Sequence, residues 1–228
     1  MNLALSALFK YSVYLFWVVA LINLYGLMFY SPLEQITKPF IVPILCLYYF
    51  SGNNRDSAYM MALFFSWIGN VLIMSPGFAM ILAGVICFWG MLLLYSYHIL
   101  KNLPGSLVDQ FKKKYAKTIV TICLVYLIII VGVLYEDLGK FVPAILFYGV
   151  TLTGAGFLSI MLWLKQKEKT TFALMSGMIL LIISGTLLTV KLFAGNNLLI
   201  ETLIRLSYIV AQFLVCLYFL KNTSINKT

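Results

Sequence analysis

The sequence has few charged residues, and acidic residues are the scarcest among them. Of its 228 residues only 10% are Asp, Glu, Lys or Arg, and just seven of these are acidic. Hydrophobic residues make up 63% and the mean hydropathy is +1.00, whereas soluble globular proteins are about 45–50% apolar and about 25% charged. This balance excludes a water-soluble enzyme, a disordered chain and a disulfide-stapled scaffold. We expect an all-α, polytopic integral membrane protein.

Metal-binding residue types are equally scarce. The chain has one histidine, His98, and no Asp or Glu lies deep within a predicted membrane span. A multi-histidine metal centre is therefore excluded, and we expect neither a metal nor a cofactor. The four cysteines fall one to a predicted helix and are interpreted as small buried hydrophobic residues. His98 itself is expected at the membrane interface.

Charge-free runs predict where the chain crosses the membrane, because a transmembrane helix needs about 20 mostly apolar residues. The run from 57 to 100 is too long for one span, and Ser75-Pro76-Gly77 divides it. The sequence predicts one integral membrane domain over residues 1–228, a bundle of eight helices. They are expected at about 11–30, 39–50, 58–74, 78–100, 117–135, 141–164, 170–193 and 198–220.

The lysines and arginines predict the orientation. With eight spans both termini lie on one side, and only Lys38, Lys140, Lys191 and Arg205 of the sixteen cations fall on the other. The positive-inside rule then places both termini in the cytoplasm, in the inner (plasma) membrane of a bacterium. The net charge of +9 is thus interpreted as membrane topology, and no nucleic-acid partner is expected.

Two pairs of segments echo each other four helices apart. Val42-Pro43-Ile44-Leu45 resembles the segment at 142–146, and the segment at 65–73 resembles the one at 181–189 when Asn70 is laid over Gly185. The halves of the bundle would then be parallel repeats of four spans. Chance similarity between apolar segments is the alternative.

Polar side chains within the predicted spans are candidates for function, because they are costly in a bilayer. At ~1.5 Å of rise per residue, they are expected from the middle of the membrane outwards. This placement predicts a polar cavity between helices, open to the outer half or laterally to lipid. The candidate binding residues are Lys38, Asn70, Ser184, Arg205, Tyr208 and Gln212.

Each candidate also has a purely structural interpretation. Glu201 and Arg205 are four residues apart and could pair with each other on one helix face. Lys38 could extend its ammonium to the lipid head groups. Asn70 and Gln212 could join neighbouring helices by hydrogen bonds.

Four short motifs follow one another in order along nearly the whole chain. They are Thr37-Lys38-Pro39, Phe65-Ser66-x-x-Gly69-Asn70-Val71-Leu72, Ser184-Gly185-x-Leu187-Leu188 and Tyr208-x-x-Ala211-Gln212. Together they resemble the YhhN-like lysoplasmalogenase family of eight-span membrane proteins. Its known members hydrolyse the vinyl-ether bond of lysoplasmalogens and release a fatty aldehyde, so the resemblance implies an ether-bond hydrolase of lipid metabolism.

The chain departs from the family pattern at the acidic residues. The pattern has Gly-Asp where this chain has Gly69-Asn70, Ser-Asp where it has Ser184-Gly185, and a histidine where it has Leu92. Vinyl-ether hydrolysis begins with proton transfer to carbon, which calls for a carboxylic acid. Neither asparagine nor glycine can supply that proton, so the chain is either a divergent enzyme or an inactive one.

No catalytic residue is assigned, and three are candidates: Asn70, Tyr208 and Glu201. Glu201, or Glu34 one turn before Lys38, could substitute for the missing acid, although both are expected to be ordinary solvated carboxylates.

Two functions therefore remain open, with a membrane lipid or lysolipid as the expected partner and the oligomeric state undetermined. One is a lysoplasmalogenase-type hydrolase. The other is a non-catalytic protein that binds or senses a lysophospholipid-type amphiphile. A small-solute transporter is a third, less favoured possibility.

Overall fold

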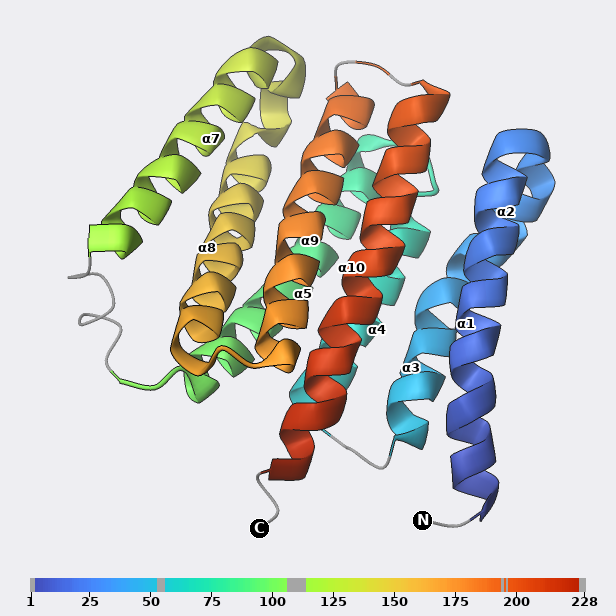
Figure 1. Cartoon of the computed structure of the whole chain (residues 1–228). Helices are drawn as coiled ribbons and strands as arrows, with labels where there is room; N and C mark the ends of the chain where they lie inside the picture. Colours follow the sequence, from blue (N-terminus) through green and yellow to red (C-terminus); the bar gives the residue numbers. More distant parts are fainter. Residues whose placement is uncertain (1–2, 53–55, 106–113, 194, 196, 226–228) are drawn as a thin grey trace.

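Helices make up nearly all of the computed structural model, which describes residues 3–52, 56–105, 114–193, 195 and 197–225 (Figure 1). No strand occurs in this part of the chain, so the all-α prediction is confirmed for it. In chain order the elements are α1 (Leu3–Phe29), α2 (Ser31–Thr37), the 3₁₀ turn η1 (Lys38–Phe40), α3 (Ile41–Ser51), α4 (Ser57–Leu72), α5 (Phe78–Asn102), α7 (Lys114–Leu138), the 3₁₀ turn η2 (Gly139–Phe141), α8 (Val142–Gln166), α9 (Lys169–Phe193) and α10 (Leu198–Ile225).

Five helical segments are long and apolar enough to cross a membrane, which identifies an integral membrane protein. They are Leu8–Phe29, Phe78–Asn102, Ala116–Gln166, Lys169–Phe193 and Leu198–Lys221. The 51-residue segment folds back at η2 into α7 and α8. Since α3 and α4 have only 11 and 16 residues, the count of eight spans stays a prediction.

The helices run alternately up and down, and the first residue of α1 and the last of α10 lie at the same end of the bundle (Figure 1). The α1–α2 pair forms one edge and α7 the other. The main helix contacts join α9 to α10, α4 to α5, and α5 to α8. Large apolar side chains point outwards, such as Ile128 and Val133 of α7, which are 71% and 74% exposed. Such a surface suits contact with lipid.

Helix α2 was not predicted, because it is short and interrupted by a charge. It folds back onto α1, where Gly26 is required: a Cβ at this position would lie 2.6 Å from the Glu34 nitrogen. Buried Asn23 of α1 donates hydrogen bonds to the Glu34 carbonyl oxygen at 3.0 Å and to Thr37 Oγ1 at 2.9 Å. This clamp fixes the position of Glu34 and of Lys38, which follows α2.

Some helix boundaries also differ from those predicted. Helix α1 begins at Leu3 and not near residue 11, because exposed Lys10 ends a charge-free run without ending the helix. Helix α4 ends at Leu72, where the chain enters a turn with the Met74 amide donating to the Val71 carbonyl. Val42-Pro43 and Val142-Pro143 each follow a 3₁₀ turn, a local likeness that leaves the parallel repeat a prediction.

His98 lies near the end of α5, and its expected place at the membrane interface stays a prediction. It is 8% exposed, and its Nδ1 lies 2.9 Å from Asp56 Oδ2. The other Asp56 carboxylate oxygen caps α4 by accepting from the amides of Ala58 and Tyr59. His98 therefore joins the end of α5 to the start of α4, at the end of the bundle where the termini lie.

Candidate functional site

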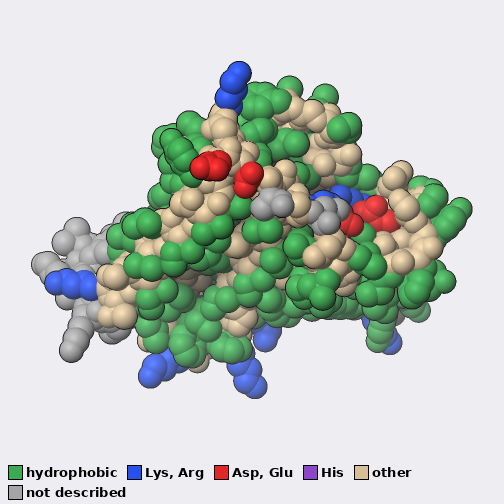
Figure 2. Space-filling model, turned by 90° about the horizontal axis from the view of Figure 1, so that it is seen from above, with side chains coloured by type: hydrophobic (Ala, Val, Ile, Leu, Met, Phe, Trp, Pro, Cys, Tyr) green, Lys and Arg blue, Asp and Glu red, His purple; other side chains and the backbone are tan. Residues whose placement is uncertain are grey.

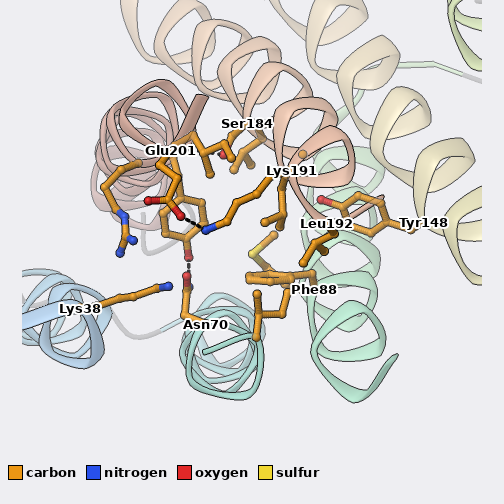
Figure 3. Close-up of a pocket in the computed structure, with 16 residues that line it drawn as sticks. Lys38, Asn70, Phe88, Tyr148, Ser184, Lys191, Leu192 and Glu201 are labelled. Atoms are coloured by element: carbon orange, nitrogen blue, oxygen red, sulfur yellow. Dashed lines mark hydrogen bonds and ion pairs between the residues drawn. The ribbon is translucent and has the colours of Figure 1, made fainter. Parts of the chain in front are cut away.

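A pocket opens at the end of the bundle opposite the termini, lined by η1, α4, α5, α8, α9 and α10 (Figure 3). It encloses about 850 Å³ of empty space, a volume that includes its open mouth. Its polar lining residues are Lys38, Asn70, Tyr148, Ser184, Lys191, Glu201, Arg205 and Tyr208. Its apolar walls include Ile73, Phe88, Met91, Leu181 and Leu188.

Charged side chains form the rim of the pocket, and from above they gather in an otherwise largely hydrophobic surface (Figure 2). Arg205 Nη2 lies 2.5 Å from Glu34 Oε1, and Lys38 Nζ lies 4.0 Å from the same oxygen. Lys191 forms an ion pair with Glu201. Three cations thus face two carboxylates, which leaves one positive charge at the rim for an anion.

Lys38 points from η1 towards the pocket (Figure 3), and its side chain is only 17% exposed. Burial, together with the nearby Arg205 guanidinium, lowers the pKa of the Lys38 ammonium to about 8, although Glu34 acts in the opposite direction. The side chain of Lys38 is thus directed to the pocket, while its depth relative to the lipid head groups stays a prediction.

The charged residues of the rim have partners on other elements. Glu201 and Arg205 were considered as a pair on one helix face, and the structure pairs Glu201 with Lys191 of α9 and Arg205 with Glu34 of α2. Glu34 and Glu201 are not solvated carboxylates, since their side chains are 14% and 22% exposed and both are ion-paired. Spacing within one helix cannot reveal these pairs, because the α1–α2 clamp and the turn between α9 and α10 create them.

A hydrogen-bonded network forms the deep side of the pocket. Asn70 Nδ2 donates to Tyr208 Oη at 2.6 Å, and Tyr208 Oη also shares a hydrogen bond with Ser66 Oγ. Behind them Gln212 Nε2 donates to Ser66 Oγ at 3.3 Å, and Tyr95 Oη donates to Gln212 Oε1 at 2.9 Å. The network joins α4, α5 and α10.

The predicted candidates therefore separate into two groups. Asn70 and Tyr208 line the pocket, while Gln212 is 1% exposed and lies behind it, where it can position Ser66 and Tyr208. Sequence reasoning did not place Tyr95 in this network, and nothing in its apolar surroundings marks it out. Ser66 could have been found, because it lies one helical turn before Asn70 and so on the same face.

Ser184 and Gly185 of α9 occupy the wall of the pocket. Ser184 Oγ donates to the Ile204 carbonyl oxygen of α10 at 3.1 Å, so this hydroxyl joins two helices. A Cβ built on Gly185 would lie 2.9 Å from Tyr148 Oη and 3.1 Å from Leu152 Cδ2. Tyr148 of α8, which sequence reasoning missed, therefore fills the space that a longer side chain at position 185 would need.

The arrangement suits binding of an anion better than acid catalysis. Glu201 is the carboxylate that lines the pocket, and Lys191 holds it. Within the described residues no three His, Cys, Asp or Glu side chains are grouped so as to hold a metal ion. The deep network offers an amide and hydroxyl groups, which can hydrogen-bond a neutral linkage but are poor proton donors to carbon.

Comparison with known proteins gives one match. The profile of the YhhN family matches residues 33–218, a range that includes every residue lining the pocket. No curated protein and no solved structure matches the chain.

Proposed function

The chain belongs to the YhhN family, and we propose that its pocket binds a single-chain amphiphile with an anionic head group, of the lysophospholipid type. The observation that carries this proposal is the order of groups in the pocket. Along α10 the charged Glu201 and Arg205 precede Tyr208, along the antiparallel α9 Lys191 follows Ser184, and apolar side chains complete the walls. A lysophospholipid has the same order of phosphate, polar linkage and hydrocarbon chain.

The rim would bind the phosphate. Lys38, Lys191 and Arg205 come from three different elements, so an anion between them would meet cations from several sides. Asn70 and Tyr208 lie in the next layer and would hydrogen-bond the linkage. The chain would follow Phe88, one of the apolar side chains beside them.

We propose binding without vinyl-ether hydrolysis, since the groups that the reaction needs do not meet at the deep network. Asn70 donates its amide to Tyr208, and position 185 is a glycine covered by Tyr148. General acid–base catalysis is typically worth about 10²–10⁴-fold. Without a carboxylic acid beside the linkage, a bound lysoplasmalogen should remain intact.

The second candidate function is the hydrolysis that the family resemblance implies. Glu201 favours it, because this carboxylate lines the pocket two helical turns from Tyr208. A ligand phosphate that displaced Glu201 from Lys191 would release a carboxyl group into the pocket. The purified protein should then release fatty aldehyde from a lysoplasmalogen, and Glu201→Gln should abolish that release.

Binding can be measured by titrating the full-length protein in detergent with a lysophosphatidylglycerol. Lys38→Gln should weaken binding roughly fivefold, the effect of about one cationic charge near a lipid phosphate. The matched control is Lys140→Gln, which removes an exposed lysine from η2 at the same end but outside the pocket. Equal effects of the two substitutions would show that the pocket does not bind the head group.

The eight-span topology, with both termini in the cytoplasm of a bacterium, is part of the proposal. Two observations support it: the first and last helices end on the same side (Figure 1), and most described lysines lie at that end. Cysteine-accessibility labelling of intact cells would test it. Substitutions at Lys10 and Lys167 should be protected from an impermeant reagent, and one at Lys140 should be labelled.

A further inference from the structure

A second groove lies at the end of the bundle where α1 begins and α10 ends. The α1–α3 pair lines one side of it, and α9 with α10 lines the other. It holds about 800 Å³ of empty space, including its open side. This groove shares no lining residue with the pocket described above.

The groove changes from charged to apolar within one helical turn. On α9, Lys169 at the rim is followed four residues later by Ala173, and on α10, Lys221 is preceded four residues earlier by Leu217. Four residues advance a helix by about 6 Å. The two helices thus present two ammonium groups at one level and apolar side chains one level deeper.

The opposite wall is formed by tightly packed groups. The rings of Phe9 and Tyr48 stack with their centroids 4.8 Å apart. Gly52, at the end of α3, leaves room for the Leu220 side chain, since a Cβ at this position would collide with it. The shape of the groove is therefore set by packed side chains on both of its sides.

This end of the molecule is also strongly cationic. Among the side chains that the structure describes there, seven lysines face two carboxylates: Lys10, Lys101, Lys117, Lys165, Lys167, Lys169 and Lys221 against Asp56 and Glu168. Asp56 is bound to His98. Exposed Glu168 accepts a hydrogen bond from Thr170 Oγ1 at 3.2 Å, so one carboxylate stands near the groove.

We propose that this groove binds one anionic phospholipid from the leaflet at the lysine-rich end. Its phosphate lies between Lys169 and Lys221, and one acyl chain passes Ala173, Leu217 and Tyr48. The charge at the rim and the apolar floor match the two parts of such a lipid. The inference does not depend on the ligand of the other pocket.

Native mass spectrometry of the full-length protein tests this site, with phosphatidylglycerol as the probe and phosphatidylcholine as the comparison lipid. The protein should retain one phosphatidylglycerol in preference to phosphatidylcholine. Lys169→Gln with Lys221→Gln should weaken retention by about thirtyfold, since each cation near the surface contributes roughly fivefold. The matched control is Lys101→Gln with Lys117→Gln, two lysines of the same end that do not line the groove.

A second variant keeps every charge. Ala173→Leu narrows the apolar floor and should also release the lipid, while thermal unfolding shows whether the variant is folded. If Ala173→Leu fails to fold, the comparison between the two lysine double variants still tests the proposal. Equal losses of phosphatidylglycerol from the two lysine double variants would mean that general surface potential, and not the groove, retains the lipid. That result would overturn the proposal. Displacement of the lipid by millimolar glycerol 3-phosphate would show a soluble phosphate site and overturn it as well.

Discussion

Gly185 provides the sharpest test of how the pocket is built. A Cβ at this position would approach Tyr148 Oη to 2.9 Å and Leu152 Cδ2 to 3.1 Å, both closer than an ordinary van der Waals contact. Inserting a methyl group into a packed site typically lowers the free energy of unfolding by about 1–3 kcal/mol. Replacing glycine by alanine within a helix raises it by about 0.8–1.0 kcal/mol, so the two effects must be separated.

Gly154→Ala on α8 separates them, because a Cβ at Gly154 would meet nothing within 4 Å. We expect Gly154→Ala to raise the melting temperature in detergent. The free energy of unfolding of Gly185→Ala should be about 1–3 kcal/mol lower than that of Gly154→Ala. In a Tyr148→Phe background the difference should shrink, because the nearest atom is gone. Equal effects of the two alanines would refute the reasoning that Tyr148 occupies this space.

The same contact affects any attempt to restore the acidic pair. Asn70→Asp with Gly185→Asp should give little aldehyde from a lysoplasmalogen while Tyr148 is present, because the new carboxylate has no room. Adding Tyr148→Ala should make room for it and raise the yield. High activity of the double variant without any change at Tyr148 would contradict this expectation.

Three other predictions concern the rim and the network. Binding of an anionic amphiphile should weaken as the pH rises through about 8, since the Lys38 ammonium is charged below its pKa and neutral above it; in Lys38→Arg this dependence should disappear, and its persistence would assign it to another group. Gln212→Leu should lower the free energy of unfolding by about 1–3 kcal/mol, because it leaves the buried Tyr95 hydroxyl without the oxygen to which it donates, whereas Ser207→Ala, which removes bonds within one helix, should change it by less than about 0.5 kcal/mol. Glu34→Gln should strengthen binding of the anionic amphiphile roughly fivefold, as it removes the carboxylate that neutralises Arg205; weaker binding would show that Glu34 instead positions the cations.

The helices and the approximate place of the pocket could be predicted from the sequence, because both depend on local or cumulative properties. Charge-free runs mark apolar helices, and polar residues in such runs are rare enough to suggest a shared cavity. Asn70, Ser184 and Tyr208 were expected at a similar depth, and the structure brings them into one pocket lining. Whether they bind a lipid remains a proposal.

The partners of the charged residues could not be predicted in this way. The bond between Arg205 and Glu34 joins residues 171 positions apart, and it exists because α2 folds back onto α1. Tyr148 was missed for a similar reason. Its contact with Gly185 depends on how α8 packs against α9. A single tyrosine in an apolar run does not indicate which residue of a neighbouring helix it will meet.

The Arg205–Glu34 bond has a consequence for biosynthesis. Its carboxylate is made near the start of the chain and its guanidinium near the end, so ribosomes working at about 5–20 residues per second leave them separated for roughly 9–34 s. During that interval Glu34 has Lys38, four residues away, as its nearest cation. The rim is therefore complete only when the last helix arrives, and a nascent protein truncated before α10 would lack it.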